Sequence, residues 1–210
     1  MTATRPSTAL RTGLRATLLV PLAALSLAGC GLNSVPTAEE VVNARFADVQ
    51  ADYQRRSDLI GNLVETVKAA AAQESSVFIG ISEARARATQ TMLSPADLGD
   101  PAKVAAFDQA QAAVGVAVRP LMGPMIQERY PELKSLQNFA SLQDQLEGTE
   151  NRINASRRDY NGAVQAYNTR IRTFPDAIGA KVFYGAKPKV PFAASAAAQE
   201  APKVDFNTTG

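Results

Sequence analysis

The sequence predicts an all-α protein, an elongated antiparallel bundle of three long helices followed by a short C-terminal helix. Aromatic residues make up only 6% of the chain, Trp is absent and Ala is abundant, a composition that suits close helix packing better than pleated sheets. Apolar residues also recur at steps of three and four over long stretches, which is helical spacing. With 210 residues and 46% apolar content, the chain is long enough for one domain with a core.

Residues 1–29 differ in composition from the rest of the chain. They contain Arg5, Arg11 and Arg15, no acidic residue, and then an apolar run over residues 16–28. A run of this length fits the apolar part of a secretion signal and is too short to span a bilayer as a helix. We therefore expect residues 1–29 to be a cleaved signal peptide.

The apolar run ends in Leu27-Ala28-Gly29-Cys30, which resembles the lipobox of bacterial lipoproteins. The resemblance implies that a diacylglyceryl group is attached to the Cys30 thiol before cleavage and that the new amine is then acylated. Cys30 is the only cysteine, so a disulfide within one chain is excluded. Since a single acyl chain holds a protein only weakly, the two or three chains of such a modification would give a stable membrane anchor.

Removal of the signal changes the net charge. Without the three signal arginines, 19 basic residues remain against 20 acidic ones, a net charge of −1. This near-neutral chain gives no electrostatic case for binding nucleic acid. Gly31 stands where enterobacterial-type sorting uses Asp for retention in the inner membrane, so we expect an envelope location, in the outer membrane facing the periplasm. Residues 30–37 are expected to form a short lipidated tether.

The first long helix is predicted to begin at Thr37, a candidate N-cap followed by the acidic residues Glu39 and Glu40. No Pro occurs from residue 38 to residue 92, and a continuous helix there would be about 80 Å long at 1.5 Å per residue. Gly61 is the expected place for a bend. Twelve of fourteen positions along one seam are apolar or aromatic: Val42, Phe46, Val49, Tyr53, Arg56, Ile60, Leu63, Val67, Ala70, Glu74, Val77, Ile81, Ala84 and Ala88.

Two more long helices are expected. A turn-rich break over residues 94–101 precedes an Ala/Val-rich segment at 102–121, which is predicted to end or kink near Arg119 and to be followed by a helical turn at 125–130. The third helix falls between residues 131 and 173. Phe174-Pro175-Asp176 then breaks it and starts a short last helix that runs through Phe183. The domain is thus expected at 38–184, with an Ala/Pro/Lys-rich, mobile tail at 185–210.

The chain lacks the residues of the common catalytic sites. It has no His, so imidazole-based triads and HExxH metal helices are absent. The sequence also has no Walker-type phosphate loop, GxGxxG turn, EF-hand loop or Ser-x-x-Lys pair. We therefore predict no enzyme activity, no catalytic or metal-binding residue and no cofactor. An enzyme using carboxylates with Tyr53, Tyr160 or Tyr167 would need a concave site where two acids converge.

Charged and polar residues concentrate in two stretches that lie within predicted helices. We interpret them as solvated faces and ion pairs between helices, with a partner-binding surface as the functional alternative. Arg56 stands out because it occupies a seam position, where a buried charge must be paired. In an up-down-up bundle with the first and third helices parallel, Glu147 or Glu150 would pair with it. The candidate residues are Arg55, Arg56, Asp58, Glu147, Glu150, Asn151, Arg152, Arg157, Arg158 and Asp159.

Several segments resemble the LemA family of bacterial envelope proteins. The stretch from Arg55 to Lys68 is similar to the family signature RRYDLIPNLVETVK, with Gly61 where the signature has Pro. Residues 130–134 and 146–161 resemble the family's YPELK and LEGTENRI…RRDYN segments, and Phe174-Pro175 and residues 204–206 fit its C-terminal region. The segment at 114–127 is richer in Gly and Pro than the family pattern.

The resemblance covers residues 38–206 and implies the elongated antiparallel helical bundle of the family. It implies no enzymatic reaction, because none is established for the family. Family members are known mainly as membrane-anchored proteins exposed outside the cytoplasm, usually through an N-terminal transmembrane helix. In this chain a lipid on Cys30 would replace that helix.

Two functions remain open. The first is a non-enzymatic interaction or scaffold protein that presents helical faces to an unidentified envelope protein or to itself. The second is a helical bundle that binds a small molecule or a lipid, for which an apolar cavity between the helices would be needed.

Overall fold

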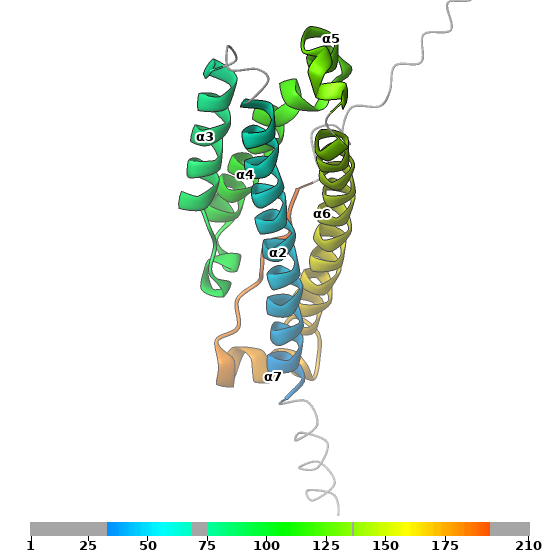
Figure 1. Cartoon of the computed structure of the whole chain (residues 1–210). Coiled ribbons are helices and arrows are strands. Elements are labelled where there is room, and N and C mark those ends of the chain that lie inside the picture. Colours follow the sequence, from blue (N-terminus) through cyan, green and yellow to red (C-terminus); the bar gives the residue numbers. More distant parts are fainter. Residues whose placement is uncertain (1–32, 69–74, 136, 194–210) are drawn as a thin grey trace, which may run out of the picture. The chain divides into compact units, whose positions relative to one another are not determined.

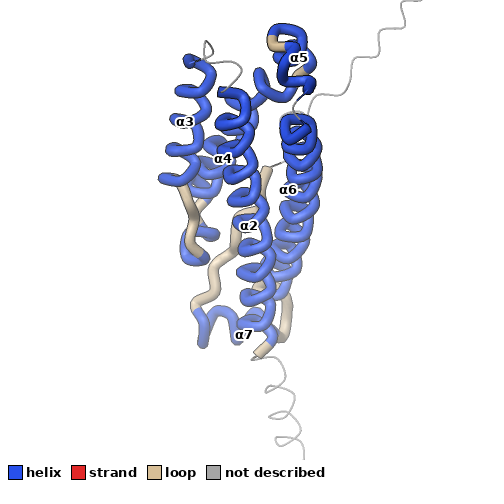
Figure 2. Tube along the Cα trace, in the orientation of Figure 1, coloured by secondary structure: helices blue, strands red, loops and turns tan. Residues whose placement is uncertain are grey.

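A computed structural model describes residues 33–68, 75–135 and 137–193, and the all-α class is confirmed (Figure 2). These residues contain only helices and loops. The signal peptide and residues 30–32 of the expected tether, including Cys30, lie outside the described residues, and the tether expectation is wrong for residues 34–37, which are helical. None of the described helices has the length and apolar character that crossing a bilayer would require. The chain divides into two compact units. Unit 1 contains Met1–Ala44 and Gly162–Lys189, and unit 2 contains Arg45–Asn161 and Val190–Gly210.

Unit 2 is a bundle of four helices that alternate in direction (Figure 1). They are α2 (Ser34–Lys68), α3 (Ser75–Gln90), α4 (Pro101–Met122) and α6 (Gln137–Arg170), of which α2 and α6 also extend into unit 1. Antiparallel packing of α2 against the chain that follows is fixed by side-chain hydrogen bonds. Arg85 Nε donates to Ser57 Oγ at 3.2 Å, and Gln50 Nε2 donates to the Leu93 carbonyl at 2.9 Å.

The expectation of one long helix over 38–92 is wrong. The structure ends α2 at Lys68 and starts α3 at Ser75, and the residues between them lie outside the described chain. No Pro or Gly occurs from residue 69 to residue 74, so local sequence does not signal the reversal. The helix also continues through Gly61, where the bend was expected. The seam nevertheless points inward, because folding α3 back onto α2 buries Ile81, Ala84 and Ala88 in the same core as Leu63.

The remaining helices lie close to their expected positions. The short 3-10 helix η1 (Pro95–Gly99) leads into α4, whose first turn is capped by Asp100, which accepts hydrogen bonds from the backbone N–H groups of residues 102 and 103. The helix runs to Met122, beyond the expected end, because Pro120 sits in its last turn, where the missing N–H affects only the end of the hydrogen-bond ladder. Then come α5 (Pro124–Arg129) and the 3-10 helix η2 (Pro131–Ser135).

An aliphatic cluster fills one part of unit 2. It joins the C-terminal half of α2 to α3, α4, α5, η2 and the start of α6. On α6 the buried residues recur every seven positions, which keeps one stripe of the helix against its neighbours. This stripe consists of Phe139, Leu146, Ile153, Tyr160 and Tyr167. The fully buried members of the aliphatic cluster include Ile60, Leu63, Val67, Leu121 and Leu133.

In unit 1 the N-terminal part of α2 packs with the end of α6, with α7 (Asp176–Gly179) and with the π-helical turn η3 (Ala180–Tyr184). The helix α2 begins at Ser34 rather than at Thr37. Pro36 is accommodated because the N–H groups of a first helical turn have no partner within the helix. The short helix after Phe174 is confirmed. It ends at Gly185, which adopts a left-handed φ of 54°.

Candidate functional site

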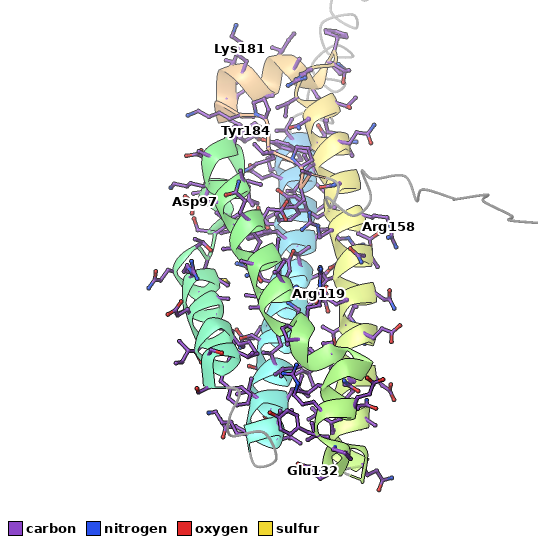
Figure 3. The ribbon with its side chains drawn as sticks, turned by 90° about the horizontal axis from the view of Figure 1, so that it is seen from above. Asp97, Arg119, Glu132, Arg158, Lys181 and Tyr184 are labelled. Carbon is purple, nitrogen blue, oxygen red and sulfur yellow. The ribbon has the colours of Figure 1, made fainter. Side chains whose placement is uncertain are left out.

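The ten candidate residues divide by burial into a buried group and an exposed group. Arg56 is only 4% exposed, and Glu150 and Arg157 are half-buried. The other seven are on the surface, and Figure 3 shows Arg158 on the outer side of α6. These exposed residues are Arg55, Asp58, Glu147, Asn151, Arg152, Arg158 and Asp159.

Arg56 is held by three helices. Its Nη1 donates to Glu150 Oε1 at 3.0 Å, and its Nη2 donates to both the backbone O and the side-chain Oε1 of Gln111 at 2.8 Å. The guanidinium also lies 4.9 Å from the centre of the Tyr53 ring, a cation–π distance. The structure therefore pairs Arg56 with Glu150, whereas Glu147 points to solvent. Arg56 lies on α2 and Glu150 on α6, and these two helices are antiparallel. The expected topology made them parallel, but α3 is a separate helix that packs antiparallel to α2 and so adds one more change of direction.

Arg157 is the centre of a second set of polar contacts, whose partners Tyr53 and Asp108 each lie three residues before Arg56 and Gln111 on their helices. Its guanidinium makes a two-pronged contact with Asp108, in which Nη1 contacts Oδ1 and Nη2 donates to Oδ2 at 3.3 Å. Nη1 also donates to the Tyr53 hydroxyl at 2.9 Å. Tyr53 therefore connects the two arginines, and we call Arg56, Asp108, Gln111, Glu150 and Arg157 the polar layer.

The pKa values of Tyr53 and Arg157, in and beside the polar layer, are both raised and so lie further above neutral pH. Burial raises the pKa of Tyr53, and the positive charge of Arg157 only partly opposes that change. For Arg157, burial acts to lower the pKa, but the hydrogen bonds and charges of Asp108 and Tyr53 outweigh it and the pKa is raised. Both groups thus keep their protons at neutral pH, whereas a general base needs a pKa near the working pH.

Residues 190–193, at the end of the described chain, are attached to unit 2 beside the polar layer. Sequence reasoning missed this attachment. In unit 2, Val190 N donates to the Leu98 carbonyl at 2.8 Å, and Asn161 forms a paired contact with the backbone N and O of Phe192 at 2.8 and 3.0 Å. The carbonyls of Val190 and Ala193 accept from Tyr160 Oη at 2.9 Å and from Arg157 Nη2 at 2.8 Å. The expected mobile tail is therefore wrong for these residues, since specific bonds fix them.

The part of this segment in unit 1 is attached in the same way. Asn168 pairs with the backbone N and O of Lys189 at 2.9 and 2.8 Å, and the Lys189 ammonium lies 2.8 Å from Glu39. Pro188 and Pro191 lack an N–H, so proline occupies positions where no donor has to be satisfied. We call residues 189–193 the C-terminal segment.

One missed residue of the polar layer carries a signal in the sequence. Gln111 lies four residues after Phe107 and three before Val114, so it occupies an apolar seam position of α4, as Arg56 does on α2. A polar residue at such a position indicates a buried hydrogen-bonding partner. Asp108 lies outside that seam and has no comparable signal. Asn161 belongs to the RRDYN segment, but its sequence does not reveal that it binds backbone.

A groove of about 290 Å³ opens beside the polar layer. It is lined by side chains of α2, α3 and α4 and of the loop after α3, among them Gln54, Arg56, Arg85, Met92 and Gln111. Its lining is mixed polar and apolar, and its volume lies at the lower edge of the range of about 300–1,000 Å³ usual for ligand sites. It is not the enclosed apolar cavity that a lipid-binding bundle would need.

The polar layer is suited to holding helices together more than to chemistry. In the described part of the chain, no three Asp, Glu, His or Cys side chains gather in a way that could hold a metal ion. The buried arginine nitrogens point to carboxylate, amide and carbonyl oxygens within the protein. Of the tyrosines suggested for an enzyme, Tyr160 is completely buried and its hydroxyl donates to a backbone carbonyl. The geometry therefore favours a structural role.

Comparison with known proteins places this architecture in a family. A model of the LemA family matches residues 45–206. The chain belongs to the LemA family. The match covers the polar layer and the C-terminal segment, so the features described above lie within the family region.

Three curated relatives match this LemA family chain. The magnetosome proteins MamQ 1 and MamQ 2 of Paramagnetospirillum magneticum are each 29% identical over 159 residues, which covers 68% of this chain and 58% of theirs. The magnetosome protein MamQ of Magnetospirillum gryphiswaldense is 28% identical with the same coverage. The chain thus spans a little over half the length of these relatives.

Proposed function

We propose that this LemA family protein is a lipid-anchored, non-enzymatic interaction protein of the bacterial envelope. The observation that carries the proposal is the division of its charged residues. Those inside unit 2 are satisfied within the protein, whereas a neighbouring set on the same helices faces solvent. The lipobox-like sequence ending at Cys30 supports the anchor, with the mature chain on the periplasmic side of the outer membrane.

Family membership supports the coarser part of this proposal. LemA family proteins are membrane-associated and have no established enzymatic reaction, and the matching relatives are named as magnetosome proteins. A helical protein whose buried arginines are paired within the chain agrees with such a role. The small mixed groove beside Arg85 does not favour ligand binding strongly enough for a second function to be proposed.

The exposed candidates on α6 give the proposed partner surface. Glu147, Asn151 and Arg158 are separated by four and seven residues, so they lie on one face of the helix. Their side chains are negative, neutral and positive in turn, and all three are exposed, which leaves their hydrogen-bonding groups available to another protein. Partner surfaces of this kind give specificity and association rate through charge complementarity.

The anchor is tested by replacing Cys30 with Ala in cells. We expect the variant to lose lipid labelling and to accumulate with its signal uncleaved, because the thiol that receives the lipid is gone. Labelling equal to that of the wild type would disprove the anchor.

The partner surface is tested with a photocrosslinking residue at Asn151 in intact cells. We expect capture of a discrete envelope protein, with the yield lowered by the double change Glu147→Lys and Arg158→Glu. The same crosslinker at the exposed position Gln109 on α4 is the control. Equal products from both positions, or products insensitive to the charge reversal, would contradict the proposed surface.

A further inference from the structure

Exposed apolar side chains are concentrated in one short stretch of unit 1. Nine large apolar side chains are exposed in the described part of the chain, and five of them fall within residues 174–184. Contiguous apolar surface of this kind marks an interaction site in a soluble domain. The five residues are Phe174 (83% exposed), Ile178 (57%), Val182 (69%), Phe183 (67%) and Tyr184 (45%).

The stretch is built with its large residues outward. Within α7 and η3, the small residues Gly179 and Ala180 are buried, while Ile178 and Val182 on either side are exposed. Ile178 and Val182 are four residues apart, which places them on one face of a helical segment. This is the reverse of an ordinary surface helix, which turns its apolar face to the core.

Basic residues accompany the exposed apolar ones. Arg172, Lys181 and Lys187 are exposed in the same part of the chain, and Lys181 and Tyr184 mark this element in Figure 3. The acidic residue of the segment, Asp176, lies 3.6 Å from Arg170. An exposed apolar face with basic neighbours is the pattern of segments that lie in the interface of anionic membranes.

The position of the stretch in unit 1 relates it to the anchor. Arg170 Nη1 donates to the Ser34 carbonyl at the start of α2, and the same guanidinium contacts Asp176 at the start of α7. The exposed stretch is therefore held beside the N-terminal end of α2 within this unit, as Figure 1 also shows. Cys30 precedes Ser34 by four residues, which span at most about 14 Å when extended.

We propose that residues 174–184 form a membrane-contacting patch that inserts into the headgroup region of the bilayer holding the lipid on Cys30. The apolar side chains of Phe174, Ile178, Val182 and Phe183 enter the interface, and Lys181 and Lys187 contact anionic headgroups. This inference rests on the proposed lipid anchor. It adds a second point of attachment, which fixes the orientation of unit 1 on the membrane.

The absence of Trp from the chain allows a direct test. Phe183→Trp places the only Trp of the chain in the patch, where it can be excited apart from the tyrosines. Val116→Trp on α4, where Val116 is 62% exposed, is the matched control. Each protein is purified from the membranes of the producing cells. It is then reconstituted into vesicles of phosphatidylcholine and phosphatidylglycerol, with or without brominated acyl chains.

We expect bromine to quench the emission of the Phe183→Trp protein about twofold, with a shift to shorter wavelength, and to leave the emission of the Val116→Trp protein unchanged. Adding Lys181→Glu and Lys187→Glu to the patch variant should reduce this quenching. A wavelength shift without bromine quenching indicates contact between copies of the protein and overturns the patch. Equal quenching in both proteins also overturns it, because the introduced indole itself favours interfaces.

Mass spectrometry of Cys30 in the same preparations separates the two proposals. A lipidated Phe183→Trp chain that floats with the vesicles but shows no quenching overturns the patch and leaves the anchor intact. Quenching in a Phe183→Trp chain without lipid supports the patch and refutes the anchor. A chain that carries no lipid and does not float overturns both.

Discussion

Two parts of unit 2 are packed by different means. The aliphatic cluster around Leu63 and Leu121 consists mainly of Leu, Ile, Val and Ala side chains, with Phe78 and Phe139, that contact one another without directional bonds. The other part joins aromatic rings to the polar layer. Its rings are those of Phe46, Tyr53, Phe107, Tyr160 and Phe192, with neighbouring centroids 4.9–6.4 Å apart, and we call them the aromatic cluster.

The difference shows how the chain obtains a unique arrangement. Apolar packing tolerates exchanges that conserve volume, so the aliphatic cluster alone would leave several registers of similar free energy. Arg56 and Arg157 each need acceptors at fixed positions, because an unsatisfied buried charge is costly. The polar layer therefore sets the register of α2, α4 and α6, and the aliphatic cluster buries apolar side chains of α2, α3, α4 and α6.

The largest expected effect is the loss of Phe107 from the centre of the aromatic cluster. Phe107 is fully buried and contacts three other rings, so Phe107→Ala should lower the free energy of unfolding by about 4 kcal/mol. Leu63→Ala in the aliphatic cluster should cost about 3 kcal/mol. Urea unfolding measures both, with the exposed Val116→Ala as the control. An effect of Phe107→Ala as small as that of the control would show that the aromatic cluster is not formed.

A second test concerns the C-terminal segment, which belongs to the aromatic part alone. Asn161→Ala removes both bonds to Phe192 and should destabilise the attached segment by about 2 kcal/mol. Because proteolysis follows the population of the open form, trypsin should release the peptide that begins at Val190 about thirty-fold faster. The control is Asn154→Ala, on the exposed side of the same helix. Equal release from both variants would mean that Asn161 does not hold the segment.

The buried half of the polar layer is tested by a double-mutant cycle. Arg56→Leu and Glu150→Ala should show a coupling of about 1.5 kcal/mol, a modest value because the Glu150 side chain is 46% exposed and partly screened by solvent. The same cycle with Glu147→Ala should give a coupling near zero, since Glu147 is on the surface. Coupling of Arg56 to Glu147 instead of Glu150 would contradict the register of α2 and α6.

The two parts also differ in how far the sequence predicts them. Apolar spacing identifies residues such as Ile60, Leu63, Leu146 and Ile153 as buried, because that pattern depends only on the helical period. The same spacing identifies Arg56 as a charge that needs a partner. The antiparallel direction of α2 and α6 was not predictable, since residues 69–74 contain no Pro or Gly to signal that α2 and α3 are separate helices.

The C-terminal segment shows a second limit of sequence reasoning. Its Pro-, Lys- and Ala-rich composition is typical of a mobile tail, yet residues 189–193 are held by side chains of α6 far earlier in the chain. Asn161 and Asn168 bind backbone atoms, so no side-chain pattern in the segment reveals the match. Local composition describes what a segment can do alone, and here the decisive bonds come from another element.

The smallest expected effect, about 1 kcal/mol, is that of Tyr160→Phe, which removes the hydrogen bond to the Val190 carbonyl and keeps the ring in the aromatic cluster. Burial raises the pKa of Tyr160, so its contribution is complete below about pH 10, the ordinary tyrosine pKa, and is lost as the pH rises above that value. The variant should therefore be less stable than the wild type at pH 7, and the difference should shrink above about pH 10. Urea unfolding at a series of pH values measures this difference. Leu63→Ala is the comparison, because the aliphatic cluster contains no titrating group and its effect should stay nearly constant over the same range. A Tyr160→Phe difference that also stays constant would mean that the Tyr160 hydroxyl is not buried against Val190, and the Tyr160 ring would then be held in the aromatic cluster by packing alone, as side chains of the aliphatic cluster are.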